Sequence, residues 1–203
     1  MSLVVIGGNS KNIGKTSVVA GLISVLQAWH WTALKITQHE HGLCAGKDEA
    51  CDRATSDHTF AVTKDEDRSG ESDTSRFLAA GAIHSWWVRT HEGHLGDAMP
   101  CIRRILAGAE NTIIESNSIL HFLKPDLYLT VLDPAIDDFK TSAQTFLDRA
   151  DAVLLNANEN SATTVWRVVS LKPVAGRPIF KIRPPSYVTP EIVEFIRSRL
   201  GPS

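Results

Sequence analysis

This sequence lacks the features that mark secreted, membrane-spanning and nucleic-acid-binding proteins. Its three cysteines are too few for a disulfide framework, and such a low, odd count suits a reducing compartment. No apolar run reaches the roughly 18 residues that a membrane helix needs, and the apolar start, MSLVVIGG, is too short for a signal peptide. The net charge of −2 gives no sign of a nucleic-acid-binding surface. We therefore expect a cytoplasmic protein that binds neither membranes nor nucleic acids.

What the sequence does contain is the composition of an ordinary globular protein. Hydrophobic residues make up 43% and charged residues 22% of the chain, and there is no internal repeat or low-complexity tract. A length of 203 residues fits one α/β domain. We therefore expect a single domain over residues 1–203.

Short apolar runs alternate along the chain with amphipathic segments, a pattern typical of a parallel sheet covered by helices on both faces. The apolar runs predict strands at residues 3–6, 31–36, 82–88, 111–115, 127–132, 152–155 and 178–182. The segments with helical periodicity predict helices at residues 16–27, 73–81, 98–106, 141–149, 163–171 and 189–200. The predicted fold is a three-layer α/β sandwich with a mainly parallel central sheet.

Residues 36–72 interrupt this alternation. The segment is rich in Asp, Glu, His and Ser and has almost no apolar periodicity, so we interpret it as a lid or substrate loop. It carries four side chains of the types that bind soft metals, His39, His41, Cys44 and Cys51, at irregular spacing. A metal site, contact of a histidine with substrate or phosphate, and a plain polar loop all remain open for them.

The clearest functional motif is GNSKNIGKT at residues 8–16, placed between an apolar strand and an amphipathic helix. In phosphate loops of the form G-x-x-x-x-G-K-[ST], backbone N–H groups and a helix N-terminus face the phosphates. Here the first glycine is Gly8, so the gap is one residue longer. We expect a P-loop NTPase fold, with Lys15 on the β- and γ-phosphates of ATP or GTP and the Thr16 hydroxyl on Mg²⁺. The candidate nucleotide-binding residues in the loop are Gly8, Asn9, Ser10, Lys11, Asn12, Ile13, Gly14, Lys15, Thr16 and Ser17.

Three further residues lie at predicted strand ends, where ligands bind in open parallel sheets. Glu115 ends the strand NTIIE and is a candidate second Mg²⁺ ligand beside Thr16. Lys35 ends the second strand and is predicted to face the γ-phosphate or an anionic substrate. Asn156 begins NANE, an echo of the base-reading N-K-x-D motif, and is a candidate base contact. Lys15, Lys35 and Glu115 are therefore the candidate catalytic residues.

These residues together resemble the MobB family, the nucleotide-binding adaptor of molybdopterin-guanine dinucleotide synthesis. That family has an N-terminal P-loop followed by a strand leading into Lys-His-x-His-His, for which residues 35–41 (KITQHEH) are the counterpart. Residues 73–82 (DTSRFLAAGA) resemble its D-S-x-x-x-x-x-A-G-A element, and residues 112–116 (TIIES) stand where it has a strand ending in E-G. The resemblance covers residues 3–160 and implies an adaptor with slow NTP hydrolysis and a partner enzyme.

The longer loop is similar to that of dethiobiotin synthetase, which also has G-x-x-x-x-x-G-K-T, a lysine where Lys35 stands and a glutamate where Glu115 stands. This second resemblance implies that these groups bind phosphate, carbamate and Mg²⁺, and that the protein is a homodimer. The E-G-A-G-G motif of that family is replaced here by ESNSI at residues 115–119.

The sequence therefore leaves three hypotheses open. The first is a Mg²⁺-dependent, MobB-like nucleotide-binding adaptor that hydrolyses ATP or GTP slowly. The second is an ATP-dependent ligase or kinase that transfers a phosphoryl group to a small acid, by positioning and charge neutralisation. The third is a binding module in which nucleotide only orders the 36–72 segment.

Overall fold

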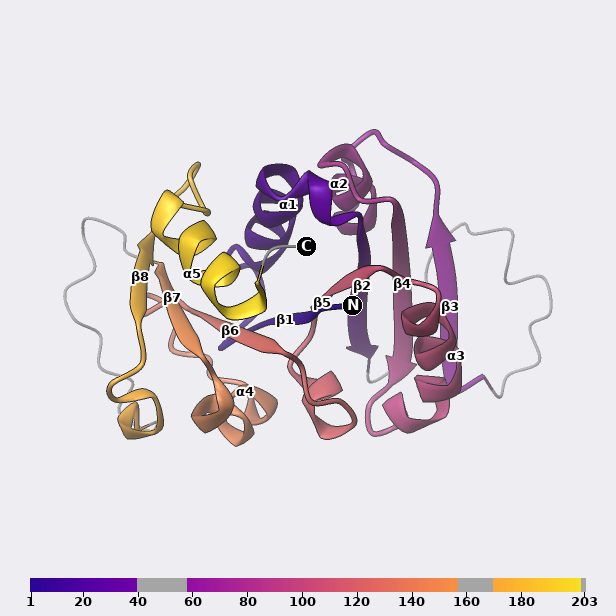
Figure 1. Cartoon of the computed structure of the whole chain (residues 1–203). Helices are drawn as coiled ribbons and strands as arrows, with labels where there is room; N and C mark the ends of the chain where they lie inside the picture. Colours follow the sequence, from indigo (N-terminus) through magenta and orange to yellow (C-terminus); the bar gives the residue numbers. More distant parts are fainter. Residues whose placement is uncertain (40–57, 157–169, 202–203) are drawn as a thin grey trace.

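The chain forms one twisted, mainly parallel sheet with helices packed on both of its faces (Figure 1). The computed structural model describes residues 1–39, 58–156 and 170–201. Eight strands of these residues are ordered β3-β4-β2-β5-β1-β6-β7-β8. All neighbouring strands are parallel except β3, which is antiparallel to β4 at one edge. The α/β class and the mainly parallel sheet predicted from the sequence are thus confirmed.

The strands begin and end close to the predicted positions where the sequence is wholly apolar. The strand bounds are β1 Leu3–Gly8, β2 Trp31–His39, β3 Phe60–Asp65, β4 His84–His91, β5 Asn111–Glu115, β6 Leu127–Leu132, β7 Ala152–Asn156 and β8 Ile179–Ile182. The helices are α1 Lys15–Val25, α2 Asp73–Ala79, α3 Leu95–Ala107, α4 Thr141–Thr145 and α5 Pro190–Leu200. Short 3₁₀ segments are η1 Gln27–Trp29, η3 Ser118–His121, η4 Leu147–Arg149 and η5 Lys172–Val174.

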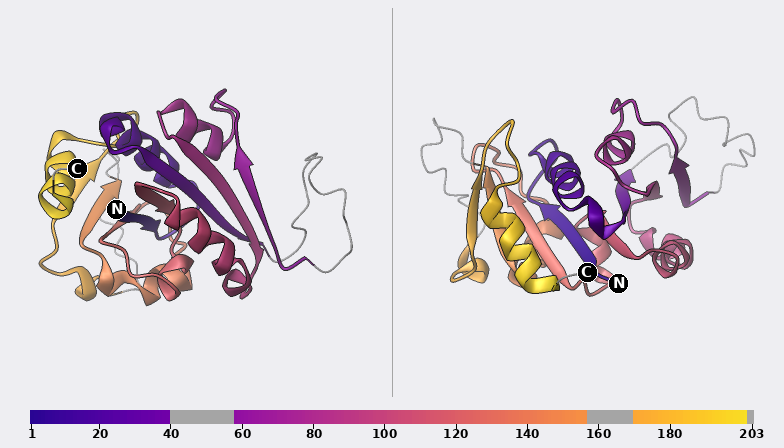
Figure 2. Two further views of the ribbon diagram at one scale, coloured as in Figure 1. Left: turned by 45° about the vertical axis from the view of Figure 1, so that its right-hand side comes forward. Right: turned by 45° about the horizontal axis from the view of Figure 1, so that its top comes forward.

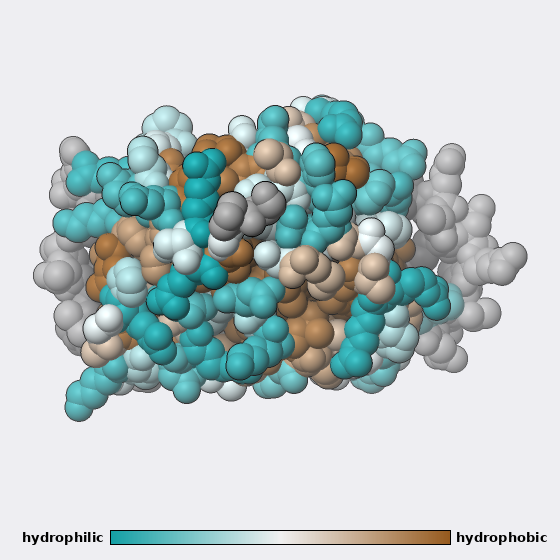
Figure 3. Space-filling model, in the orientation of Figure 1, coloured by the Kyte–Doolittle hydropathy of each residue, from teal (hydrophilic) through white to brown (hydrophobic). Residues whose placement is uncertain are grey.

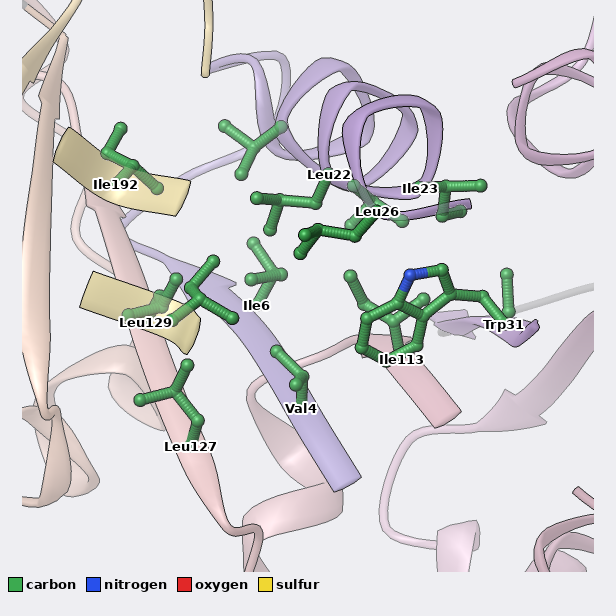
Figure 4. Packing of buried hydrophobic residues seen from close by; sticks show 14 of the residues in the cluster. Val4, Ile6, Leu22, Ile23, Leu26, Trp31, Ile113, Leu127, Leu129 and Ile192 are labelled. Carbon is green, nitrogen blue, oxygen red and sulfur yellow. The ribbon is translucent and has the colours of Figure 1, made fainter. Parts of the chain in front are cut away.

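Alternate residues of the central strand β1 face two separate apolar cores, which explains why the whole strand is hydrophobic. Val4 and Ile6 join a core with α1, α2 and α5, whereas Leu3 and Val5 join a core with α3 and the η3 and η4 segments. Figure 4 shows the first core, in which side chains of α1 pack onto the sheet. The two further views show α1, α2 and α5 on one face and α3 on the other (Figure 2). Three layers result, as predicted.

The prediction of one continuous loop over residues 36–72 is wrong at its start and within it, whereas its end before α2 is right. Strand β2 continues to His39, and β3 forms an antiparallel edge strand over Phe60–Asp65. Phe60 and Val62 of β3 lie two residues apart, so they share one face of the strand, and both pack against the second core. The second half of the strand is polar, which is why a search for apolar runs misses it. Residues 40–57, with His41, Cys44 and Cys51, lie outside the described residues, as does most of the predicted helix 163–171.

Several element boundaries also differ from prediction for local reasons. Ser72, not Asp73, caps α2: its hydroxyl accepts from the N–H of Ser75, and the Ser75 side chain bonds back to Ser72. Helix α3 starts at Leu95 and contains Pro100 in its second turn. The predicted helix 141–149 is divided into α4 and η4.

The face of the molecule seen in Figure 3 is largely hydrophilic, with smaller apolar areas between polar side chains. Large hydrophobic residues that are strongly exposed include Val25, Ile83 and Ile179, of which Ile179 lies on the edge strand β8. None of the helices in the described residues is long and apolar enough to cross a membrane.

Candidate functional site

The Gly8–Thr16 loop connects the carboxyl end of β1 to the N-terminus of α1, at the middle of the sheet. Two residues in it have left-handed backbones, Asn12 with φ 58° and Gly14 with φ 94°, and these curl the chain into the first turn of α1. A Cβ on Gly8 would lie 2.7 Å from both Ile13 Cδ1 and the backbone oxygen of Val131. Only glycine therefore fits at the start of this loop.

Hydrogen bonds fix the first two loop residues from behind. Asn117 accepts from the N–H of Gly8 and donates to its carbonyl, both at 2.9 Å. The N–H of Asn9 donates to Val131 O at 3.2 Å, and its side-chain oxygen accepts from the N–H of Asp133 at 2.9 Å. The N–H groups of Gly8 and Asn9 thus have partners inside the protein, and both residues shape the loop. Their contact with a nucleotide stays a prediction.

The next part of the loop is anchored by one apolar and one polar side chain. Ile13 is 1% exposed and belongs to the core with α1, so its side chain holds the loop down and does not face a ligand. The Ser10 hydroxyl donates to Asp138 at 2.7 Å. The first N–H groups of α1, from Lys15 onward, have no acceptor within the helix. They form the positive end of the site.

Strand register brings Lys35 and Glu115 together. Lys35 of β2 is paired with Glu115 of β5, and Glu115 is also paired with Ile6 of β1. Both side chains lie on the sheet face that α1 covers, because Ala33 and Ile113, two residues earlier, belong to the same core as α1. Lys35 Nζ donates to Glu115 Oε1 in an ion pair, and Thr16 Oγ1 donates to Glu115 Oε2 at 2.9 Å. The predicted trio of Thr16, Lys35 and Glu115 therefore forms one cluster.

Asp73 joins this cluster from α2, which the sequence did not predict. Its carboxylate lies 2.9 Å from Lys35 Nζ, and Thr16 Oγ1 lies 3.4 Å from the same nitrogen. Since Ser72 takes the capping role, the Asp73 side chain is free to turn toward the sheet. The sequence did contain a hint of this role, because Asp73 is the first residue of the DTSRFLAAGA element that resembles a MobB motif.

Comparison with known proteins adds a fold likeness. No protein-family model and no curated protein matches the chain. The structure is similar to that of LpxK from Aquifex aeolicus in complex with ATP, with 18% identity, a TM-score of 0.49 and coverage of 89% of this chain and 53% of the other. It is also similar to HypB from Helicobacter pylori in complex with nickel, with 15% identity, a TM-score of 0.48 and coverage of 96% and 83%. This chain spans about half the length of the LpxK chain. At these identities the similarity concerns the fold alone.

Lys15 points back along its own loop, where its ammonium group donates to the carbonyl of Ser10. Burial lowers the pKa of Lys15 to about 8, Glu115 opposes that shift, and the neighbouring charges of Lys140 and Lys35 add to it. Lys15 is thus a buried amine whose charged form a bound anion would stabilise, which suits the site to bind phosphate.

The cation position between Thr16, Glu115 and Asp73 has the donor set of a magnesium site. Three oxygen atoms from these residues surround Lys35 Nζ, which stands where a divalent cation would sit. A hydroxyl and carboxylates are the ligands that Mg²⁺ prefers, and nucleotide-bound Mg²⁺ needs only one or two of them from protein. In the described parts of the chain, no group of three or more His, Cys, Asp or Glu could hold a metal ion by itself. The residues present thus fit Mg²⁺ that arrives with a nucleotide.

His39 and Asn156 complete the predicted set. His39 lies at the end of β2, and its Nε2 lies 3.2 Å from Thr37 Oγ1. Asn156 ends β7, is 6% exposed and donates from Nδ2 to Asp133 at 2.9 Å. Its Oδ1 is buried and has no hydrogen-bond partner among the described residues. The base-contact role of Asn156 therefore stays a prediction. Its unpartnered Oδ1 is the atom that could accept a hydrogen bond from a base.

A groove of about 460 Å³ adjoins the loop on the outer side of α1. Ser17 and Gly21 of α1, Arg76 of α2 and Tyr187 are among the residues that line it. Arg76 donates to the hydroxyl of Ser17 at 3.0 Å, and a Cβ on Gly14 would come within 2.3 Å of the Tyr187 ring. The tyrosine therefore lies directly against the turn that begins α1.

Proposed function

We propose that this protein binds a nucleoside triphosphate with Mg²⁺ at the Gly8–Thr16 loop. The observation that carries the proposal is the arrangement of Thr16, Lys35, Glu115 and Asp73 at the N-terminus of α1. Sheet register and helix placement bring these residues from four separate elements to the one loop that carries a G-K-T motif. The ammonium group of Lys15, which lies against the loop, adds a cation suited to the β- and γ-phosphates.

The Mg²⁺ of this complex would be held by Thr16 and Glu115, with Asp73 as a further oxygen ligand. When bound, the ion neutralises charge on the transferred phosphoryl group. Lys35 then leaves the position between these oxygens, and its ammonium group turns toward the terminal phosphate. The residues would thus act by positioning and by charge, with Lys15 on one side of the phosphates and Lys35 on the other.

The groove beside α1 supports a place for the nucleoside. It opens next to Ser17, one residue beyond the Mg²⁺ ligand Thr16, and Tyr187 offers an aromatic face there. Aromatic rings stack on any base, so Tyr187 favours neither ATP nor GTP. Discrimination would fall to Asn156, whose unpartnered Oδ1 accepts a hydrogen bond from an amine of the base.

Within this activity, the resemblance to the MobB family supports an adaptor that hydrolyses nucleotide slowly and acts on a partner enzyme. A second candidate is phosphoryl transfer to a small acid, in a homodimer of the dethiobiotin-synthetase type. The observation that favours it is the excess of lysines around the loop, because an anionic acceptor needs cations beyond those that hold the nucleotide. A nucleotide-binding module without chemistry is a third candidate.

Turnover measurements separate these candidates. An adaptor hydrolyses Mg·ATP or Mg·GTP slowly and accelerates only with its partner protein. A ligase or kinase turns over only when the correct acid is added. A binding module without chemistry binds nucleotide with no turnover under any of these conditions. Thr16→Ala and Glu115→Gln are each expected to remove the dependence of nucleotide binding on Mg²⁺. Equal nucleotide affinity with Mg²⁺ and with a chelator in the wild type would rule out the proposed metal-dependent site.

A further inference from the structure

The segment after β6, residues 133–140, runs beside the phosphate loop and is tied to it; we refer to it as the strap. The backbone N–H of Lys140 donates to the carbonyl of Asn9 at 2.8 Å. The Asn9 side chain donates to the carbonyl of Asp138 at 3.1 Å, and the Ser10 hydroxyl donates to the Asp138 carboxylate at 2.7 Å. Because Asn9 is fully buried, these bonds fix the end of the strap relative to the loop.

The backbone bond to Asn9 holds Lys140 directly beside the phosphate loop, and its side chain is half-buried there. The pKa of Lys140 is lowered by burial and next by the positive charge of Lys11, whereas Asp138 and Glu115 oppose the shift. Lys35 and Lys15 also interact electrostatically with Lys140.

No internal carboxylate neutralises these two lysines by direct contact. Lys35 has ion pairs with Glu115 and Asp73, whereas Lys140 and Lys11 have none within the described residues. Lys11 is exposed and Lys140 is half-buried. Their like charges repel, and an anion bound between them would offset this repulsion. Such unbalanced charge in a cleft is characteristic of functional sites.

We propose that Lys140, with Lys11, forms a second cationic pole of the loop that binds anionic oxygen atoms beyond those held by Lys15. The ligand chemistry is a phosphate or carboxylate oxygen. It belongs either to the terminal phosphate of the nucleotide or to an anionic acceptor next to it. Lys140 is thereby a binding residue carried on the strap, outside the G-K-T motif. This inference rests on the proposed nucleotide site. It adds a residue that binds the terminal phosphate or the anion next to it.

The test compares triphosphate and diphosphate binding in Lys140→Met. Isothermal titration calorimetry is run with ATP and ADP, or with GTP and GDP, each with Mg²⁺. If Lys140 contacts the terminal phosphate, Lys140→Met weakens triphosphate binding by about 10- to 100-fold and leaves diphosphate binding nearly unchanged. Lys140→Arg, which keeps the charge, retains most of the preference for triphosphate.

A second titration identifies the other source. The diphosphate complexes of the wild type and of Lys140→Met are titrated with inorganic phosphate and with acetate. If the wild type binds one of these anions and Lys140→Met does not, Lys140 binds an acceptor anion and not the terminal phosphate. Unchanged binding in both titrations would overturn the inference, and so would equal weakening of diphosphate and triphosphate. Absence of nucleotide binding in the wild type is a different result, because it removes the proposed function itself.

Lys124→Met is the matched control. Lys124 is exposed and precedes the amino end of β6, so it lies at the opposite edge of the sheet from the loop. Its loss should leave all affinities unchanged. Thermal unfolding of Lys140→Met without ligand checks the fold, which we expect to survive because the hydrogen bond to Asn9 uses the backbone of Lys140.

Discussion

The side-chain amide of Asn117 forms two hydrogen bonds of 2.9 Å with the backbone of Gly8, one to the N–H and one to the carbonyl. Both groups are buried, and a Cβ on the preceding Gly7 would lie 2.1 Å from Asn117 Oδ1. Asn117 thus holds the first glycine of the loop in place from the strand-end turn after β5. The longer gap between Gly8 and Gly14 is accommodated by this anchor and by the contacts of Asn9.

Asn117→Ala should therefore loosen the loop. Removing both hydrogen bonds leaves two buried backbone groups unpaired, at a cost of about 2–4 kcal/mol in the free energy of unfolding. Urea denaturation measures this cost, and Gln144→Ala, at an exposed position of α4, serves as control. A loss below about 0.5 kcal/mol would show that the anchor is not needed for stability.

Lys35→Met tests whether Lys35 occupies the cation position. Glu115 is 3% exposed, so the loss of its ion pair should lower the free energy of unfolding by about 3 kcal/mol. We expect Mg²⁺ to raise the thermal midpoint of Lys35→Met more than that of the wild type, since the ion then replaces the missing charge. Lys64→Met, at an exposed position on β3, should behave like the wild type. The same response to Mg²⁺ in all three proteins would contradict the assignment.

Stability should depend on pH through Lys15. Burial lowers its pKa from 10.5 in the unfolded chain to about 8 in the folded protein, so the unfolded state binds more protons between these values. The contribution of Lys15 to stability therefore rises as the pH increases from about 8 to 10.5. Lys15→Met removes that contribution, and we expect its stability advantage over the wild type to narrow over this range. Urea denaturation of both proteins at several pH values measures the difference, and a pH-independent difference would argue against a buried, charged Lys15.

Tyr187 is expected to bind the nucleoside and not the phosphates. Tyr187→Ala should weaken ATP or GTP binding by about 10-fold through lost stacking, whereas Tyr187→Phe should retain it. Inorganic tripolyphosphate, which lacks a nucleoside, should bind both variants and the wild type equally in calorimetry. If tripolyphosphate binding falls as well in Tyr187→Ala, the ring acts by supporting Gly14 and not by contact with the base.

The sequence predicted best what depends on local pattern. Strands Asn111–Glu115 and Leu127–Leu132 have the predicted bounds, and each is buried along its whole length. The final helix begins at Pro190, as its proline at the first turn indicated. Glu115 ends β5 as predicted. The predicted strand end at Lys35 is wrong, because β2 continues to His39, and Lys35 reaches the site through its pairing with Glu115.

What the sequence missed depends on contacts between distant segments. Asp73 was interpreted as a helix cap, whereas in the fold it pairs with Lys35 and leaves the cap to Ser72. The strap is bound to the loop by residues more than 120 positions apart, as in the contact of Asn9 with Asp138. No local periodicity reports such contacts, so Lys140 could not be placed in the site before the fold was known.

The most direct test of the account is calorimetric titration of the wild type and Lys15→Ala with Mg·ATP and with Mg·GTP. We predict that the wild type binds at least one of the two, and that Lys15→Ala weakens this binding by about 100-fold or more while remaining folded. The same experiment decides between ATP and GTP. Nucleotide affinity that is unchanged in Lys15→Ala would contradict the central claim that the Gly8–Thr16 loop binds the phosphates.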